Sequence, residues 1–346
     1  MTSRELAIPP HFDKERVGKV WRIDFESRAH EAREWREKHM LLPASSDSKS
    51  ICLLLVDVQN TFCIPDFELF VAGRSGTGAV DDNRRLCEFI YRNLARITQV
   101  NCTLDTHQAM QIFHAVFLID ANGDHPDPLT VVTEEAVRKG RWRINPEICE
   151  PLGISAEYGQ RYLRHYARTL KQESKLDWTI WPYHAMLGSI GHALVSAVHE
   201  AIFFHGLARY SLPNFEIKGS NHLTEHYSLF GPEARTGPDG EQIAEKNRKF
   251  IQKLTEFDYV LIAGQAKSHC VAWTIEDLLN DRVTQEKGFA DKIYLLEDCT
   301  SPVVVSGTVD FAEEADAAFA KFEKAGMHLV RSTDSVDKWP GLELES

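Results

Sequence analysis

Three polar residues that could form a nucleophilic site follow apolar stretches of the chain. Asp57 ends the run that starts at Ile51, Lys218 follows Phe215-Glu-Ile, and Cys270 comes shortly after the run 259–263. A carboxylate can accept the proton of a thiol, and a nearby ammonium group stabilises the charged forms of both. The start of a helix at Cys270 should also favour the thiolate. These residues could therefore attack a carbonyl group, although a buried thiol and a structural Asp–Lys pair are the alternative interpretations.

A second group of residues could bind a metal ion. Asp105 and His107 are two residues apart in an extended segment, so their side chains point the same way. His184 follows the apolar stretch 178–181 and could complete the ligand set, although it could also be a packed or surface histidine. Mixed oxygen and nitrogen ligands suit a divalent metal, and we expect zinc, with iron or manganese as alternatives. His114 and His125 are interpreted as exposed or packed histidines.

The segments that carry these residues alternate between strand and helix patterns from residue 51 onward. Continuously apolar runs such as Ile51-Cys-Leu-Leu-Leu-Val are typical of strands that are covered on both faces. The alternation predicts a parallel sheet with helices on both faces, and ligands bind such sheets at the carboxyl ends of the strands. Both groups of residues should therefore meet at one edge. The predicted strands are 51–57, 99–104, 178–181, 214–217, 258–263, 292–296 and 327–331, and the predicted helices are 81–97, 134–139, 156–172, 189–205, 241–255, 270–280 and 310–325.

Five motifs around these residues resemble those of the isochorismatase-like cysteine hydrolases, and among them the nicotinamidases. They occur in the order of the family and span roughly residues 51 to 300. The motifs are Val56-Asp-Val-Gln-Asn-Thr-Phe, Leu104-Asp-Thr-His, Trp181-Pro-Tyr-His, Ile217-Lys-Gly with Tyr227-Ser-Leu-Phe, and Ala263-Gly-Gln-Ala-Lys-Ser-His-Cys-Val.

The resemblance implies a three-layer α/β/α fold with a six-stranded, doubly wound parallel sheet. It also implies roles for individual residues, including a cis peptide at Gln265–Ala266. Asp57, Lys218 and Cys270 match the catalytic triad, and Asp105, His107 and His184 match the metal ligands. The N–H groups of Ala266 and Cys270 would form the oxyanion hole, and Phe62, Trp181 and Gln265 would contact the substrate.

The activity that the resemblance implies is cysteine-dependent hydrolysis of a small planar amide such as nicotinamide, with release of ammonia through a thioester. Two alternatives stay open: a related hydrolase that acts on another amide or ureido compound, and a non-catalytic protein with the same fold. Ala185 replaces a cysteine that usually follows the metal-binding histidine, and about seventy residues separate His107 from Trp178. We expect residues 1–49 to form an N-terminal helical extension and residues 50–346 to form one isochorismatase-like domain with an insertion at about 108–177.

Composition limits the classes of partner. With 43% hydrophobic and 26% charged residues, the 346-residue chain is typical of a globular protein. A net charge of −12 argues against a nucleic-acid partner, and the chain has no apolar stretch long enough to span a membrane. Seven scattered cysteines with no CxxC pair, and no signal-like N-terminus, favour reduced thiols in a cytoplasmic protein. We expect a homo-oligomer whose partner is a small-molecule amide.

Overall fold

A six-stranded parallel sheet forms the centre of the protein in the computed structural model, which describes residues 5–173 and 175–344. Its strand order is β10-β7-β6-β1-β2-β5, and every neighbouring pair is parallel. The strands are β1 (Ile51–Val56), β2 (Gln99–Asp105), β5 (Asn214–Lys218), β6 (Tyr259–Gly264), β7 (Ile293–Leu296) and β10 (His328–Val330). The predicted three-layer α/β/α fold is confirmed.

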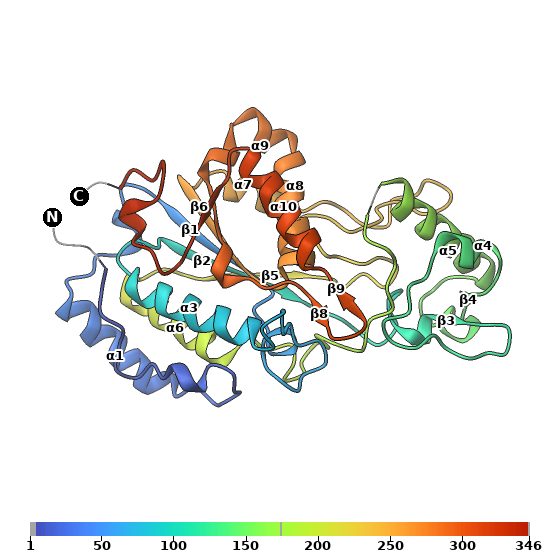
Figure 1. Ribbon diagram of the computed structural model, residues 1–346, viewed down its shortest axis with the longest axis horizontal. Helices are drawn as coiled ribbons and strands as arrows, with labels where there is room; N and C mark the ends of the chain where they lie inside the picture. The colour runs from blue at the N-terminus through green and yellow to red at the C-terminus, as the bar shows by residue number, and fades with distance from the viewer. Residues whose placement is uncertain (1–4, 174, 345–346) are drawn as a thin grey trace.

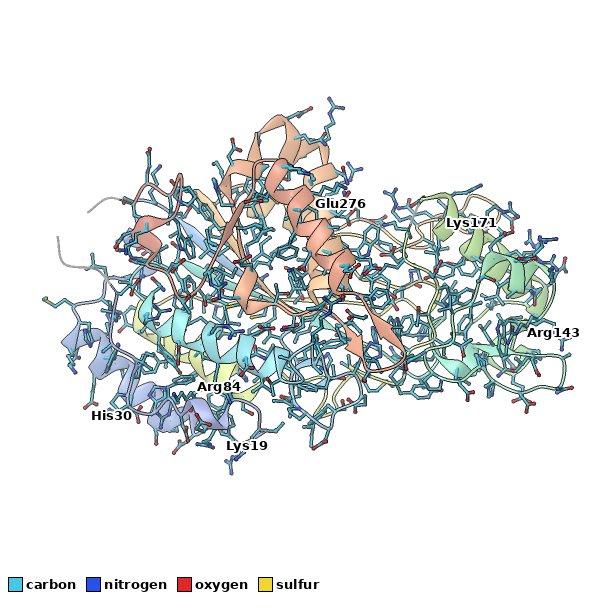
Figure 2. All side chains as sticks on the ribbon, viewed as in Figure 1. Lys19, His30, Arg84, Arg143, Lys171 and Glu276 are labelled. Carbon is cyan, nitrogen blue, oxygen red and sulfur yellow. The ribbon has the colours of Figure 1, made fainter. Side chains whose placement is uncertain are left out.

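Helices cover both faces of this sheet (Figure 1). On one face lie α3 (Gly78–Arg92) and α6 (Ser196–Arg209), with α1 (Phe25–Lys38) packed against α6. On the other face lie α7 (Arg248–Leu254), α8 (Ala272–Asn280), α9 (Arg282–Glu286) and α10 (Ala312–Lys324). Figure 2 shows Arg84 of α3 and Glu276 of α8 on these opposite faces. A short helix α2 (Asn60–Cys63) follows β1, and a small hairpin of β8 (Val304–Val305) and β9 (Val309–Asp310) precedes α10.

Strand β1 shows why the central sequence is continuously apolar. Leu53 and Leu55 belong to the core on the α3 and α6 side, whereas Cys52 and Leu54 belong to the core on the α8 side. All six residues of β1 are buried, because both of its faces are covered. The two cores together hold the carboxyl ends of the strands in fixed positions.

In the described part of region 108–177, the strands are short, β3 (Leu118–Ile119) and β4 (Arg143–Ile144), and the α-helices are α4 (Glu134–Arg138) and α5 (Ala156–Gln172). This region lies at the opposite end of the molecule from the two chain termini (Figure 1), where Figure 2 labels Arg143 and Lys171. Buried residues of α5 join the core on the α8 side of the sheet. The boundaries predicted for this insertion and for the N-terminal extension stay predictions.

The predicted strand at 178–181 is wrong, because this segment does not join the sheet. It pairs instead with residues 129–132 of the insertion: Val132 N donates to the Trp178 carbonyl over 2.7 Å, and Ile180 N donates to the Thr130 carbonyl over 2.9 Å. Trp178 and Ile180 are buried, which explains the apolar pattern. The insertion thus provides the hydrogen-bond partners that a sheet strand would otherwise provide.

Two predicted helices begin later than their patterns indicated. The helix expected at 189–205 starts at Ser196, because the preceding segment is held against the ends of the strands. In that segment the Ala185 carbonyl accepts from His107 N at 3.0 Å, and the Ala193 carbonyl accepts from Asn60 N at 2.8 Å. The helix expected at 241–255 starts at Arg248.

All seven cysteines are buried and none forms a disulfide, as the sequence predicted. Within the described ranges, no helix is both long enough and apolar enough to cross a membrane.

Candidate active site

The predicted site residues lie together at the carboxyl edge of the sheet. Asp57 follows β1 directly, Asp105 ends β2 and Lys218 ends β5. Cys270 follows β6 and lies in a π-helical turn, Lys267–Val271, that leads into α8. Because these strands are neighbours, the sheet brings residues that are more than 200 positions apart in the sequence to one place.

Lys218 is the centre of the nucleophilic group. Its Nζ lies 3.0 Å from Asp57 Oδ2, 3.6 Å from Cys270 Sγ and 2.9 Å from Asp105 Oδ1. Nζ also donates to the His226 carbonyl at 2.8 Å. Asp57, Lys218 and Cys270 are only 0%, 3% and 7% exposed, so these interactions take place in a water-poor environment. The three residues predicted as a catalytic triad are therefore in mutual contact range.

Burial and the neighbouring charges together set the charge states of this group. Burial tends to lower the pKa of Lys218, but Asp105 and Asp57 raise it well above its ordinary value, so Lys218 carries a positive charge. Burial raises the pKa of the Cys270 thiol well above its usual range, although Lys218 acts in the opposite direction. Desolvation is the largest influence, and it outweighs the effects that favour the thiolate. Cys270 keeps its proton until a base removes it.

Asp57 is placed to be that base. Burial raises its pKa, against the influence of Lys218, so its affinity for a proton is greater than that of an exposed carboxylate. Thr103 fixes it from the neighbouring strand: Thr103 Oγ1 donates to Asp57 Oδ1 at 2.5 Å and accepts from Asp57 N at 2.9 Å. Sequence reasoning did not identify Thr103, whose only signal is its position two residues before Asp105.

The turn between β6 and Cys270 has the predicted cis peptide at Gln265–Ala266. Gly264 precedes it with a φ of +122°, and a Cβ at this position would lie 2.0 Å from the Val56 carbonyl oxygen, so only glycine fits. The Ala266 N–H donates no hydrogen bond to any described residue. A free N–H beside a thiol is what an oxyanion hole requires, and the roles of Ala266 and Cys270 N in it stay predictions.

Gln265 does not have a free side chain for a substrate. Its Nε2 donates to Asp82 Oδ2 at 2.8 Å, and its Oε1 accepts from Ser301 N at 3.2 Å. The side chain is 1% exposed, and both ends of the amide are used inside the protein. We therefore correct its predicted role from substrate contact to positioning of the turn.

A histidine cluster lies beside Lys218. His107, His114 and His184 are buried, and each offers a ligand nitrogen within 4.8 Å of the others. In each ring Nδ1 contacts a backbone carbonyl: His107 reaches His184 O at 3.2 Å, His114 reaches Ala109 O at 3.1 Å, and His184 reaches Pro182 O at 2.7 Å. If these Nδ1 atoms carry the hydrogen, each Nε2 has a free lone pair, which is the arrangement that orients histidine ligands around a metal.

The donor set fits a divalent cation. His114 Nε2 is buried and has no hydrogen-bond partner in the described parts of the chain. Burial lowers the pKa of His184 to about 3 and that of His114 to about 4, so both rings are neutral near neutral pH and available as ligands. Asp105 adds a carboxylate, with Oδ1 3.1 Å from His107 Nε2 and Oδ2 3.9 Å from His184 Nε2. Three imidazoles and one carboxylate suit zinc, and they are compatible with iron or manganese.

His114 corrects the sequence interpretation, which left it out of the ligand set. It lies in the insertion next to Phe113, and Trp181 N donates to the Phe113 carbonyl at 2.8 Å, which brings His114 to the segment that leads to His184. The contact joins segments nearly seventy residues apart, so no local pattern revealed it. The available signal was a third histidine seven residues after His107.

Aromatic residues surround the two groups. The Phe62 ring meets His184 edge-on at 5.6 Å between centroids, next to the candidate metal ligands. Trp181 donates from Nε1 to Tyr227 Oη at 3.0 Å, and both rings meet His269, the residue before the nucleophile, at 5.7 and 5.4 Å. Phe62 and Trp181 thus lie beside the candidate site, as expected of residues that flank a planar substrate.

Comparison with known proteins connects this arrangement to a fold class. No family model matches the sequence, and no curated protein matches it. Two structures of the yeast nicotinamidase Pnc1p, one bound to the inhibitor nicotinaldehyde, are similar to this chain with a TM-score of 0.50 each. They are 20% and 18% identical to it, and each comparison covers 81% of this chain and 99% of the yeast chain.

A nicotinamidase pyrazinamidase of Acinetobacter baumanii is 19% identical over 83% of this chain and 98% of its own, with a TM-score of 0.47. These proteins belong to the isochorismatase-like superfamily. The chain has the fold of the yeast enzyme. The resemblance inferred from the motifs is therefore confirmed at the level of the fold.

Proposed function

We propose that this protein is a cysteine amidohydrolase that releases ammonia from a small planar amide, with nicotinamide as the leading substrate. The observation that carries the proposal is the set of contacts made by Lys218, whose ammonium group touches Asp57, Cys270 and Asp105 within 3.6 Å. Three coupled ionisable groups buried beside a histidine cluster are costly to maintain for structure alone.

The first half of the reaction forms a thioester. Asp57 takes the proton of Cys270 as the sulfur attacks the amide carbonyl carbon, so the thiol never has to ionise alone in a site that disfavours the thiolate. The carbonyl oxygen gains the negative charge and accepts from the N–H groups of Ala266 and Cys270. The C–N bond then breaks, and ammonia leaves with the proton that Asp57 returns.

The second half regenerates the enzyme. Asp57 removes a proton from a water molecule, whose oxygen forms a bond to the thioester carbon. The C–S bond breaks, the carboxylic acid product forms, and Cys270 recovers its proton from Asp57. Lys218 stays protonated throughout, because its two carboxylate neighbours hold its pKa well above the ordinary value against the effect of burial. It balances the charge that moves between Asp57 and the sulfur.

The candidate metal site and the aromatic residues define where a substrate would lie. Asp105, His107, His114 and His184 would hold a divalent cation, which would supply Lewis acidity toward a ring nitrogen or a water molecule. Phe62 and Trp181 would lie against the faces or edges of a planar ring and exclude water from the carbonyl carbon. A flat amide with a ring nitrogen satisfies both features. The predicted homo-oligomer and cytoplasmic location stay predictions.

The test is ammonia release from nicotinamide and pyrazinamide by the metal-loaded protein and by its Cys270→Ala variant. A matched control is Cys87→Ala, which removes another buried thiol, on α3. We expect turnover by the parent and the control, none by Cys270→Ala, and an acyl-enzyme mass on Cys270 after rapid quenching. Turnover that survives in Cys270→Ala would exclude the nucleophile, and activity only on other amides or ureido compounds would change the substrate class.

A further inference from the structure

A cavity of about 440 Å³ lies at the other end of the sheet from the candidate active site. Its walls come from four parts of the chain: the N-terminal segment with Leu6, residues 39–42 and residues 46–49, the stretch before β2 with Ala95 and Arg96, the end of α6 with Arg209, and Leu344 near the C-terminus. None of the lining residues belongs to the active-site groups. The cavity therefore requires a separate explanation.

The charged side chains of the cavity wall are mostly cationic. Lys49, Arg96 and Arg209 line it together with a single carboxylate, Asp47, in a chain whose net charge is −12. Arg209 is already used for structure, because it donates to the carbonyls of Leu42 and Leu94 and to Asp47. Lys49 and Arg96 are the cations that could meet a ligand.

Both of these cations have unused capacity. Arg96 is only 8% exposed, and its Nη2 bonds Asp337 at 2.5 Å, but its Nε has no partner among the described residues. Lys49 Nζ lies 3.5 Å from Asp258, at the outer limit of a hydrogen bond. Asp258 and Asp337 are about 36% and 44% exposed, and neither lines the cavity. An anion in the cavity would give Arg96 and Lys49 an acceptor that their present partners do not fully supply.

The apolar part of the wall includes Leu6, Leu41, Leu42 and Leu344, and Ser46 and Ser48 also line the cavity. His39 also lines the cavity, and burial together with Lys38 lowers its pKa, so its ring is uncharged at neutral pH. A ligand for this cavity must combine one negative charge with a compact apolar body. The volume is in the range of small-molecule sites, which is roughly 300–1,000 Å³.

We propose that this cavity binds a small amphipathic carboxylate, with its head at Arg96 and Lys49 and its body against the leucines. The proposal goes beyond the amidase function and does not depend on it. A bound ligand would connect the N-terminal segment to the sheet and to the C-terminal segment. Because only the folded chain presents this cavity, the ligand would raise the unfolding temperature by mass action.

The experiment measures binding of hexanoate and cyclohexanecarboxylate by calorimetry and by thermal unfolding. Hexanol serves as the neutral analogue, and inorganic phosphate as an anion without an apolar body. Lys49→Met and Arg96→Met remove the two cations, and Arg33→Met, on the exposed surface of α1, is the matched control. We expect saturable binding of both carboxylates, weakened about tenfold in each cavity variant and unchanged in the control, because charge-assisted hydrogen bonds contribute on this scale.

Other outcomes would overturn the proposal. These are no saturable binding, equal binding by Lys49→Met and Arg33→Met, or equal binding of hexanol. Phosphate that binds as tightly as hexanoate would show an inorganic anion site instead. If the carboxylate binds in the active site and not in the cavity, its affinity will be the same for the parent and for Lys49→Met, because Lys49 lies outside the active site. If Arg96→Met fails to fold without its Asp337 partner, the more exposed Lys49→Met decides the question.

Discussion

Replacement of Lys218 by methionine tests the electrostatic centre of the candidate site. Methionine keeps most of the length and apolar volume of the lysine stem, so the change removes mainly the ammonium group. That group contacts Asp57 at 3.0 Å, Asp105 at 2.9 Å and the His226 carbonyl at 2.8 Å, and the side chain is almost completely buried. Its loss leaves two buried carboxylates without their shared cation.

The expected cost follows from these contacts. Removing one partner of a buried ion pair costs about 3–5 kcal/mol, and a buried carbonyl without a donor adds about 1–3 kcal/mol. Protonation of Asp57 relieves part of this penalty, so we expect the free energy of unfolding to fall by about 4–5 kcal/mol near neutral pH. For a chain of this size that is a decrease in unfolding temperature of roughly 6 °C.

The pH dependence has a definite sign. Burial already raises the pKa of Asp57 in the parent, and loss of Lys218 removes the charge that opposes this increase. A group whose pKa is raised by folding contributes full stability below its unfolded pKa, and loses that contribution as the pH rises through its folded pKa. The difference in stability between parent and variant should therefore grow as the pH rises above the ordinary range of an aspartate pKa.

Thermal and urea unfolding followed by circular dichroism measure this difference. Lys321→Met is the control, since its ammonium group pairs with Glu276 at 2.6 Å on the surface and the lysine side chain is 57% exposed. That variant should lose less than about 1 kcal/mol. Our reasoning about Lys218 would be refuted if the two variants unfolded alike, or if the Lys218→Met deficit shrank as the pH rose.

Three further substitutions test individual contacts. Thr103→Val removes both hydrogen bonds to Asp57 and should lower kcat by roughly 10- to 100-fold, measured as ammonia release, whereas an unchanged kcat would show that Asp57 needs no such support. His114→Gln should weaken metal binding, measured by competition with a chelator, by more than the roughly 10- to 100-fold that is typical when a residue behind a metal ligand is lost. If the variant keeps the metal as tightly as the parent, the ligands are restricted to Asp105, His107 and His184. Gln265→Leu should lower the free energy of unfolding by about 2–3 kcal/mol and reduce kcat with little change in KM. A rise in KM alone would instead show that Gln265 contacts the substrate.

The parts of the site that sequence could predict are those carried by strand ends. Continuous apolar runs identified β1 and β6, and the residue that ends or follows such a run must lie at the carboxyl edge of a parallel sheet. This reasoning predicted the positions of Asp57 and Lys218 at that edge before any of their contacts were known. It extended to Cys270 because the turn after β6 is short.

What the sequence did not reveal depends on contacts between distant segments. His114 lies next to Phe113, whose carbonyl accepts from Trp181 N, nearly seventy residues further along the chain. The burial of Trp178 and Ile180 gave the segment 178–181 the apolar pattern of a sheet strand. The pKa of Cys270 depends on how completely the surrounding chain excludes water, which is a property of the whole fold. A helix start indicates that one contribution lowers this pKa, but it does not show whether that contribution exceeds the opposing effect of burial.

The strand order explains why a lysine occupies position 218. The order β5-β2-β1-β6 places β2 between the strand that carries Lys218 and the strand that precedes Asp57. Lys218 pairs in register with Asp105 on β2, so its side chain passes that carboxylate before it meets Asp57 one strand further on. Two strand spacings are about 9–10 Å, a span that needs a long, flexible stem with a terminal charge. The same crossing joins the candidate metal group to the group of Asp57, Lys218 and Cys270, because Asp105 contacts both His107 and Lys218. The two groups that looked independent in the sequence therefore share one carboxylate, and a change in either group must alter the charge that the other one faces.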